Sequence, residues 1–123
     1  MTESLSNPWN ILAFVPARDF ETSTEFYKRL GFDVAMDEDV RYCSLGDHGF
    51  LLQDYYVKKW ADNFMLAMHV DDAQAWIDRA EALVADFPGV RTADPNLEDW
   101  GMIVGHIWDP TGVLWHITQT PSD

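Results

Sequence analysis

The residues that could carry out acid–base or nucleophilic chemistry are few in this chain of 123 residues. There are four histidines and a single cysteine, Cys43. No nucleophile elbow, phosphate-binding glycine loop or HExxH motif occurs in the sequence. His69 and His106 fall on expected strands with no acid or nucleophile beside them in sequence, so structural or surface roles are expected. His48 falls in a turn, and Cys43 is expected to be a buried apolar residue.

The six tryptophans are a stronger signal than the titratable residues. Trp100 follows two acidic residues, Glu98 and Asp99, and this combination suits a planar cationic or heteroaromatic ligand. Trp60 lies in a polar crossover, where a fully buried indole is not expected. Three others are expected to be structural: Trp76 on the apolar side of a helix, Trp115 beneath a helix, and Trp108 in the core or at an interface.

The charge of the chain excludes several classes of partner. Eight Lys and Arg against 21 Asp and Glu give a net charge of −13. Nucleic acid and anionic membranes are not expected as partners, because phosphate groups bind to basic patches. A cationic ligand would be attracted, although acidity also serves solubility alone. The lone cysteine, the lack of a signal peptide and the lack of an 18-residue apolar run predict a cytoplasmic protein.

The first half of the chain alternates short apolar segments with turn signals. A strand is predicted at residues 10–15, and Pro16 is expected to end it. Asp19 is expected to cap a helix at residues 20–30, and Gly31 to terminate that helix. Three further strands are predicted, separated by an acidic turn at residues 37–39 and a GDHG turn at residues 46–49. They cover residues 32–36, 41–45 and 50–56.

The second half repeats the same order of elements. A strand is predicted at residues 64–70, and Asp71 or Asp72 caps a second helix whose apolar positions continue to Val84. A short strand at residues 90–93 follows a Pro88-Gly89 break, and a hairpin ends the chain. We therefore predict one α+β domain over residues 1–123. It contains two βαβββ modules, at about residues 8–60 and about residues 61–120.

The predicted terminal hairpin organises the rest of the chain. It follows an acidic turn that begins at Pro95. Its own turn is the DPTG segment that starts at Asp109, in which Pro presets φ and Gly supplies a free φ. Residues 102, 104, 106 and 108 alternate with residues 103, 105 and 107. Because both sets are largely apolar, one face is expected to meet the core and the other a second subunit or a ligand cleft.

The paired βαβββ order, the segment VPARDFETSTEFYKRLGF and the DPTG turn before the last strand resemble the vicinal oxygen chelate superfamily, which includes glyoxalase I and extradiol dioxygenases. Within that superfamily, the ARDF opening and the EDWG segment around Trp100 resemble the bleomycin-resistance proteins. The resemblance covers almost the whole chain. It implies that each module forms a cupped mixed sheet. It also implies a homodimer whose ligand clefts lie between modules of both chains.

Metalloenzymes of the superfamily hold a divalent ion with four residues, one on each of four strands. Counted by register, these positions fall on Leu12 or Ala13, Gln53, Met65 and His116. Two polar candidates among four positions make a poor divalent site. No metal, no other cofactor and no catalytic residue are therefore expected. Gln53 and His116 are either a hydrogen-bonded interior pair or donors to a polar ligand.

The resemblance implies that the protein sequesters a bleomycin-type glycopeptide antibiotic without catalysis and thereby confers antibiotic resistance. The ligand would be cationic with a flat aromatic part, on which aromatic side chains stack while carboxylates supply negative potential. A glyoxalase- or dioxygenase-like metalloenzyme and a binding protein for an unrelated planar metabolite are the alternatives. Exchange of the N-terminal strand within the dimer is left open. The expected ligand-binding residues are Trp100, Gly101, Tyr42, Trp60, Gln53, His116, Asp54, Asp62, Glu98 and Asp99.

Overall fold

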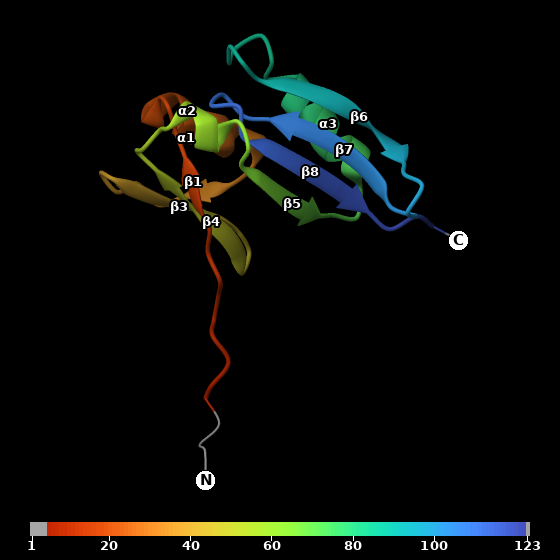
Figure 1. Cartoon of the computed structure of the whole chain (residues 1–123), viewed down its shortest axis with the longest axis horizontal. Coiled ribbons are helices and arrows are strands. Elements are labelled where there is room, and N and C mark those ends of the chain that lie inside the picture. Colours follow the sequence, from red (N-terminus) through yellow and green to blue (C-terminus); the bar gives the residue numbers. More distant parts are fainter. Residues whose placement is uncertain (1–4, 123) are drawn as a thin grey trace.

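The computed structural model describes residues 5–122 and contains two modules, each built on a four-stranded mixed sheet (Figure 1). A one-turn helix, α2 (Lys58–Ala61), lies in the crossover between them. The predicted α+β class and the predicted order of elements are confirmed. The first module contains β1 (Phe14–Pro16), α1 (Phe20–Leu30), β2 (Asp33–Val34), β3 (Val40–Leu45) and β4 (His48–Gln53). The second contains β5 (Met65–His69), α3 (Ala73–Glu81), β6 (Arg91–Leu97), β7 (Ile103–Trp108) and β8 (Leu114–Gln119).

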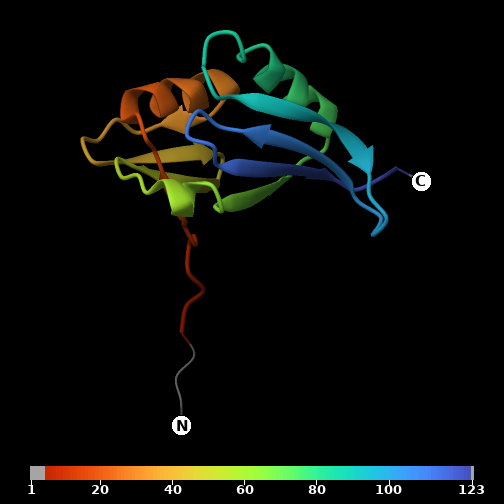
Figure 2. The same cartoon turned by 45° about the horizontal axis from the view of Figure 1, so that its top comes forward.

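The two sheets have the same topology. The strand order is β1-β4-β3-β2 in the first sheet, sheet A, and β5-β8-β7-β6 in the second, sheet B. The first strand of each module pairs in parallel with its last strand, and the other pairs are antiparallel. Helices α1 and α3 lie on one side of the sheets (Figure 2). Each sheet therefore has one face toward the helices and one open face.

The helices begin where the capping residues predict. The Asp19 side chain accepts a hydrogen bond from the Thr22 backbone N–H at 3.1 Å, and Gly31 ends α1 with a φ of 122°. Asp72, rather than Asp71, caps α3. Helix α3 ends at Glu81, earlier than predicted, and the chain continues in tighter turns in which N–H groups bond to the carbonyl three residues back. No helix within residues 5–122 is long and apolar enough to cross a membrane.

The predicted bounds of three strands in the first module are wrong. Each differs at both ends, and in particular β1 begins at Phe14 and not at residue 10, while β4 ends at Gln53 and not at residue 56. β1 includes Pro16 instead of ending before it, because β1 is an edge strand and does not need the missing N–H. β2 is two residues long, where residues 32–36 were predicted. β4 begins at His48, because Gly46 adopts a φ of 58° and allows a two-residue turn where four residues were predicted.

The strand β6 also differs from the prediction. It continues to Leu97 across Pro95, with a shift in pairing register between Ala93 and Asn96. This irregularity accommodates a proline, because Pro95 has no N–H to donate to the ladder. The acidic turn therefore begins at Glu98 and not at Pro95. As a result, Trp100 lies at the tip of the β6–β7 connection.

An aromatic cluster joins the two modules. The ring of Tyr27 on α1 lies 4.9 Å from that of Phe50 in sheet A and 6.1 Å from that of Trp115 in sheet B, measured between centroids. The ring of Phe32 packs against those of Phe50 and Trp115, at 5.4 Å and 6.0 Å between centroids. Trp115 is therefore packed beneath α1 as predicted, whereas Trp76 is only partly buried at the edge of the core.

The DPTG turn is held by the fully buried carboxylate of Asp109. Its Oδ1 atom accepts three hydrogen bonds, and its Oδ2 atom accepts one from the Tyr27 hydroxyl at 2.6 Å. Trp115 Nε1 donates to the Tyr27 oxygen at 2.9 Å. Burial raises the pKa of Asp109 to about 6 despite these donors. The network ties the last turn of the chain to its first helix. The Oδ1 donors are the backbone N–H groups of Thr111, Gly112 and Val113.

Candidate functional site

The β6–β7 turn presents Trp100 to solvent. Gly101 adopts a φ of 98°, and its N–H donates to the Glu98 carbonyl at 2.9 Å, so the turn is closed on itself. The Glu98 N–H donates to the Met102 carbonyl at 2.8 Å. The Trp100 side chain is 68% exposed, while Glu98 is half-buried and Asp99 is exposed beside it. The turn can therefore offer an indole face and two carboxylates to a ligand.

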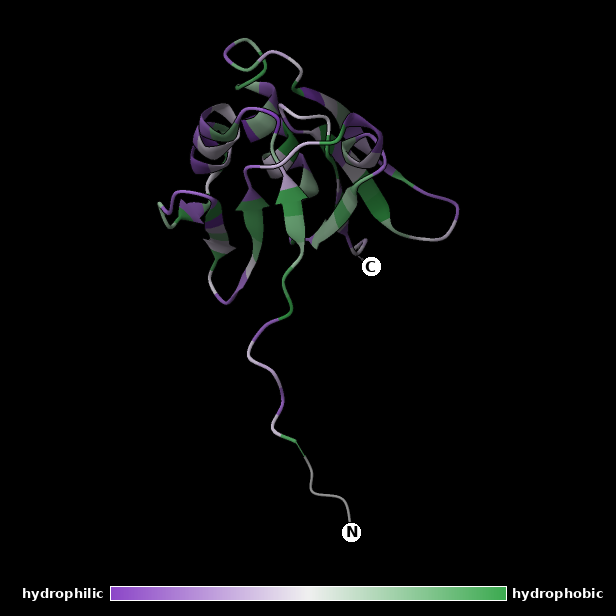
Figure 3. Ribbon diagram, turned by 60° about the vertical axis from the view of Figure 1, so that its left-hand side comes forward, coloured by the Kyte–Doolittle hydropathy of each residue, from purple (hydrophilic) through white to green (hydrophobic). Residues whose placement is uncertain are grey.

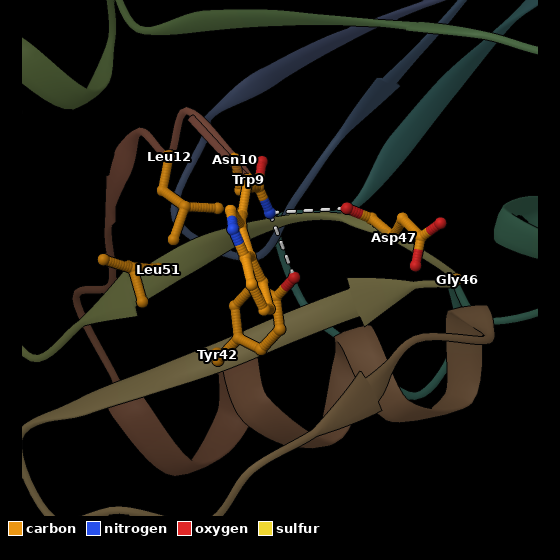
Figure 4. A pocket seen from close by; sticks show the side chains of 7 residues that line it. All are labelled: Trp9, Asn10, Leu12, Tyr42, Gly46, Asp47 and Leu51. Carbon is orange, nitrogen blue, oxygen red and sulfur yellow. Dashed lines mark hydrogen bonds between the residues drawn. The ribbon is translucent and has the colours of Figure 1, made fainter. Parts of the chain in front are cut away.

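Tyr42 lies on the open face of sheet A, where Phe14, Leu51 and Tyr42 are neighbours across three strands. A pocket of about 680 Å³ adjoins it (Figure 4). Asn10 reaches into this pocket, and its Nδ2 donates to the Tyr42 hydroxyl at 3.2 Å and to the Asp47 carbonyl at 3.4 Å. The pocket is lined by Trp9, Asn10, Leu12, Tyr42, Gly46, Asp47 and Leu51.

Trp60 lies on α2 and is 61% exposed, as its polar surroundings in the sequence predict. Its ring centroid lies 6.2 Å from that of Tyr55. Asp62 accepts a hydrogen bond from the Lys58 ammonium group at 2.5 Å, so part of its negative charge is already compensated. Asp54 is exposed at the end of β4. Both aspartates flank Trp60 in sequence. Of the two carboxylates, Asp62 alone has an ion-pair partner among the described residues.

The structure does not gather the predicted binding residues into one cluster within a single chain. Tyr42 belongs to sheet A and Trp60 to the crossover, whereas the turn that carries Trp100 lies at the end of sheet B remote from sheet A (Figure 1). Gln53 and His116 also lie in different sheets. The interior pair that these two residues could have formed is not present among the described residues.

The open face of sheet B carries His116 and His106, which are paired directly across β8 and β7. Their ring centroids are 5.0 Å apart, and Nε2 of His116 lies 3.4 Å from Sδ of Met65. Burial lowers the pKa of His106, His116 lowers it further, and Glu98 opposes both effects. Trp108 lies on the same face, and the Arg91 guanidinium stacks on its ring at 4.2 Å.

The four positions that hold a divalent ion in metalloenzymes of the resembled superfamily do not form such a site here. Leu12 and Ala13 offer no donor atom, and Met65 offers only a thioether. Gln53 and His116 lie in separate sheets. Within residues 5–122, no group of three or more His, Cys, Asp or Glu side chains converges. The donor set does not fit a hard or borderline divalent cation.

Several residues of these faces were not among the predicted binding residues. Trp9 and Asn10 border the Tyr42 pocket, although they are 32 or more positions away from Tyr42 in sequence. His106 and Met65 flank His116 on sheet B. The alternation of residues 102–108 groups His106 with Trp108 but does not say which face of the sheet they lie on. Alternation also does not show which strand pairs with β7 or in which register.

Comparisons with known proteins agree with this architecture. A family model described as the Glyoxalase/Bleomycin resistance protein/Dioxygenase superfamily matches residues 11–117. A bleomycin resistance protein of Klebsiella pneumoniae is 25% identical over 114 residues, which cover 85% of this chain and 87% of that protein. A crystal structure of a bleomycin resistance determinant encoded on the transposon Tn5 has a TM-score of 0.78 at 23% identity, over 92% of this chain and 98% of that chain. A bleomycin-binding protein complexed with bleomycin has a TM-score of 0.76 at 23% identity, over 91% and 98% of the two chains. The chain therefore belongs to the glyoxalase/bleomycin resistance protein/dioxygenase superfamily.

Proposed function

We propose that this protein binds a bleomycin-type glycopeptide antibiotic and sequesters it without catalysis. The observation that carries the proposal is the exposed indole of Trp100, held on a closed turn between Glu98, Asp99 and Gly101. The indole can stack on a flat ligand, and the carboxylates of Glu98 and Asp99 can attract a cationic one. The similarity to a bleomycin resistance protein and to a bleomycin-binding protein supports bleomycin as the ligand class.

The closed conformation of the turn lowers the entropy cost of stacking a ligand on Trp100. Because the backbone around Trp100 is fixed by two hydrogen bonds, little backbone entropy is lost when a ring stacks on it. Stacking contributes about 0.5–1.5 kcal/mol beyond the burial of area, and more when the ligand ring is cationic. The net charge of −13 adds long-range attraction for a cation.

A closed cleft requires a second copy of the chain. Tyr42 and Trp100 lie on different sheets, and each open face exposes large apolar side chains to solvent. In the proposed homodimer, sheet A of one protomer faces sheet B of its partner, so that the Tyr42 face and the Trp100 turn border the same cleft. Figure 3 shows hydrophobic residues along the strands. The exposed apolar residues of the two sheets include Phe14 and Met65, at 53% and 61% exposure.

The test is isothermal titration of the purified protein with metal-free bleomycin. We expect saturable binding with one ligand per chain. Trp100→Ala is expected to weaken the affinity by about 2 kcal/mol or more, as truncation of a stacking residue at the centre of an interface does. Calorimetry is preferred over fluorescence here, because the substitution removes a reporter tryptophan.

Leu97→Ala is the matched control. Leu97 has the same 68% exposure as Trp100 and ends β6 just before the turn, but offers no ring on which to stack. Its substitution should leave the affinity unchanged. Equal affinity of wild type and Trp100→Ala would remove Trp100 from the site. Absence of binding by the wild type at tens of micromolar drug would contradict bleomycin as the ligand and favour an unrelated planar metabolite.

A further inference from the structure

We propose that the open face of sheet B contains a site for a soft monovalent metal cation, Cu(I), formed by Met65, His106 and His116. All three donors belong to one chain, so the inference does not require antibiotic binding, and this face also borders the cleft of the proposed dimer. It starts from three donor atoms on three adjacent strands, since β5, β8 and β7 are neighbours in sheet B. The site shares Met65 and His116 with the four-strand pattern of the metalloenzymes. It differs from that pattern because its third donor, His106, lies on β7 and no residue of sheet A takes part.

The first step is the distance between the sulfur of Met65 and Nε2 of His116, which is 3.4 Å. A metal about 2.3 Å from a sulfur and about 2.0 Å from a nitrogen, at a tetrahedral angle, separates the two donors by about 3.5 Å. The observed separation is therefore one that a single ion bridges. In the protein without metal, the same geometry is a weak N–H···S hydrogen bond when Nε2 carries the proton. When the ion binds Nε2, the proton moves to Nδ1, so that the imidazole stays neutral.

The second step is the position of His106. It is paired directly opposite His116 across the β7–β8 ladder, and the two ring centroids are 5.0 Å apart at an interplanar angle of 69°. The χ2 torsion of histidine is broad, so either ring can turn a nitrogen toward a shared ion at little cost. The strands themselves do not have to move.

The third observation is that an ion can reach these side chains from solvent. The residue level with His116 on β5 is Ala67, which is exposed and small, so nothing bulky covers the imidazole from that side. Met65 is 61% exposed, and its flexible side chain can adjust to the ion. Trp108 borders the cluster, with its ring 5.8 Å from that of His106, and provides a fluorescence reporter.

The donor set selects the ion. Two neutral imidazoles and a neutral thioether bring no negative charge to the site, and a thioether is a soft ligand. Such a set suits a soft monovalent ion better than Mg²⁺ or Mn²⁺, which prefer carboxylate and water oxygens, or a structural Zn²⁺ site, which is usually four-coordinate. The overall charge of −13 attracts any cation to the protein. The selectivity therefore comes from the sulfur and the two nitrogens.

The experiment uses Ag(I) as a redox-stable probe and Cu(I) under anaerobic conditions, with the full-length protein. We expect one ion per chain and quenching of tryptophan fluorescence. Met65→Leu, His106→Gln and His116→Gln should each weaken the affinity by about tenfold or more, since each removes one donor of three. Zn²⁺ should bind more weakly than Ag(I) and should be little affected by Met65→Leu.

Two variants serve as controls. His69 lies on the same face, but its two ring nitrogens already contact the hydroxyls of Thr118 and Thr120, at 3.0 Å and 3.2 Å. His69→Gln should therefore leave silver binding unchanged. Cys43→Ala should do so too, because the thiol is fully buried. The proposal is overturned if the wild type binds neither ion at tens of micromolar, or if a control variant loses as much affinity as Met65→Leu. Either failure leaves the bleomycin titration of the wild type unaffected.

Discussion

Among the single residues, Asp109 is a carboxylate held in the interior of the protein. It is fully buried, it accepts bonds from three backbone N–H groups and from Tyr27, and its pKa is nevertheless raised to about 6 because burial outweighs these donors. The pKa in the unfolded chain is near the ordinary value of 3.8. The folded state therefore binds more protons than the unfolded state between about pH 4 and pH 6.

The first prediction is a pH dependence of stability with the sign that this difference requires. As pH rises through that window, the Asp109 contribution to the free energy of unfolding should fall by on the order of 3 kcal/mol, and it should be constant above it. Asp109→Asn removes this titration. The measurement is urea unfolding of wild type and Asp109→Asn at intervals from pH 4 to pH 7. The free energy of unfolding of the wild type minus that of the variant should fall with rising pH. Parallel curves would mean that Asp109 keeps an ordinary pKa in the folded protein.

At the scale of the element, the packing of α3 on sheet B depends on the absence of a side chain at residue 105. A Cβ atom built on Gly105 would lie 2.8 Å from Cγ1 of Ile77 on α3 and 3.1 Å from Cγ of Pro95 on β6. Gly105 is not among the glycines with positive φ, so steric space is the reason for glycine here. The helix thereby approaches the backbone of β7 directly.

We therefore predict that Gly105→Ala lowers the free energy of unfolding by about 1–3 kcal/mol through overpacking. Ile77→Ala should also be destabilising, because it leaves a cavity in the core. In the double variant the new methyl group occupies part of that cavity, so its loss should be smaller than the sum of the single losses. Chemical denaturation of the four proteins measures this coupling. Strict additivity would show that Ile77 is not the group that excludes the alanine methyl.

Across the protein as a whole, several large hydrophobic residues within residues 5–122 are exposed to solvent. The exposed large hydrophobic residues lie on the N-terminal segment before β1, on the open faces and on the turns. The N-terminal segment extends away from the body of the protein (Figures 1 and 2). Large apolar side chains exposed on the open face of a sheet, such as Phe14 and Met65, are typical of an interface. The residues are Leu5, Trp9, Ile11, Phe14, Met36, Tyr55, Trp60, Met65, Leu97 and Trp100.

The corresponding prediction is that the protein sediments as a dimer and that Phe14→Glu shifts it toward monomer. Phe14 is 53% exposed on the open face of sheet A, where a carboxylate would be buried without a partner in the proposed interface. Gln74→Glu adds the same charge at an exposed position of α3, on the helical side of the protein, and should not change the oligomeric state. Analytical ultracentrifugation distinguishes these outcomes. A monomeric wild type at tens of micromolar would contradict the two-chain cleft.

Sequence by itself determined the elements whose causes are local. The bounds of α1 follow from Asp19 and Gly31, and the DPTG turn follows from its own residues. The alternation in β7 separates Gly105 and Ile107 from His106 and Trp108. Capping, turn preference and side-chain alternation act over a few residues, so they can be read from the chain. The repeated order of elements and the resemblance to a superfamily rest on the same local signals.

Features that depend on residues distant in sequence are visible in the folded protein alone. The bond between Tyr27 and Asp109 spans 82 positions, and the contact between Met65 and His116 spans 51. A hydrogen-bonded interior pair of Gln53 and His116 is compatible with the sequence, but the two residues lie in different sheets. Such proximities are set by strand order and by the packing of two modules on one aromatic core. These depend on the summed burial of many side chains, and no short stretch of sequence contains that information.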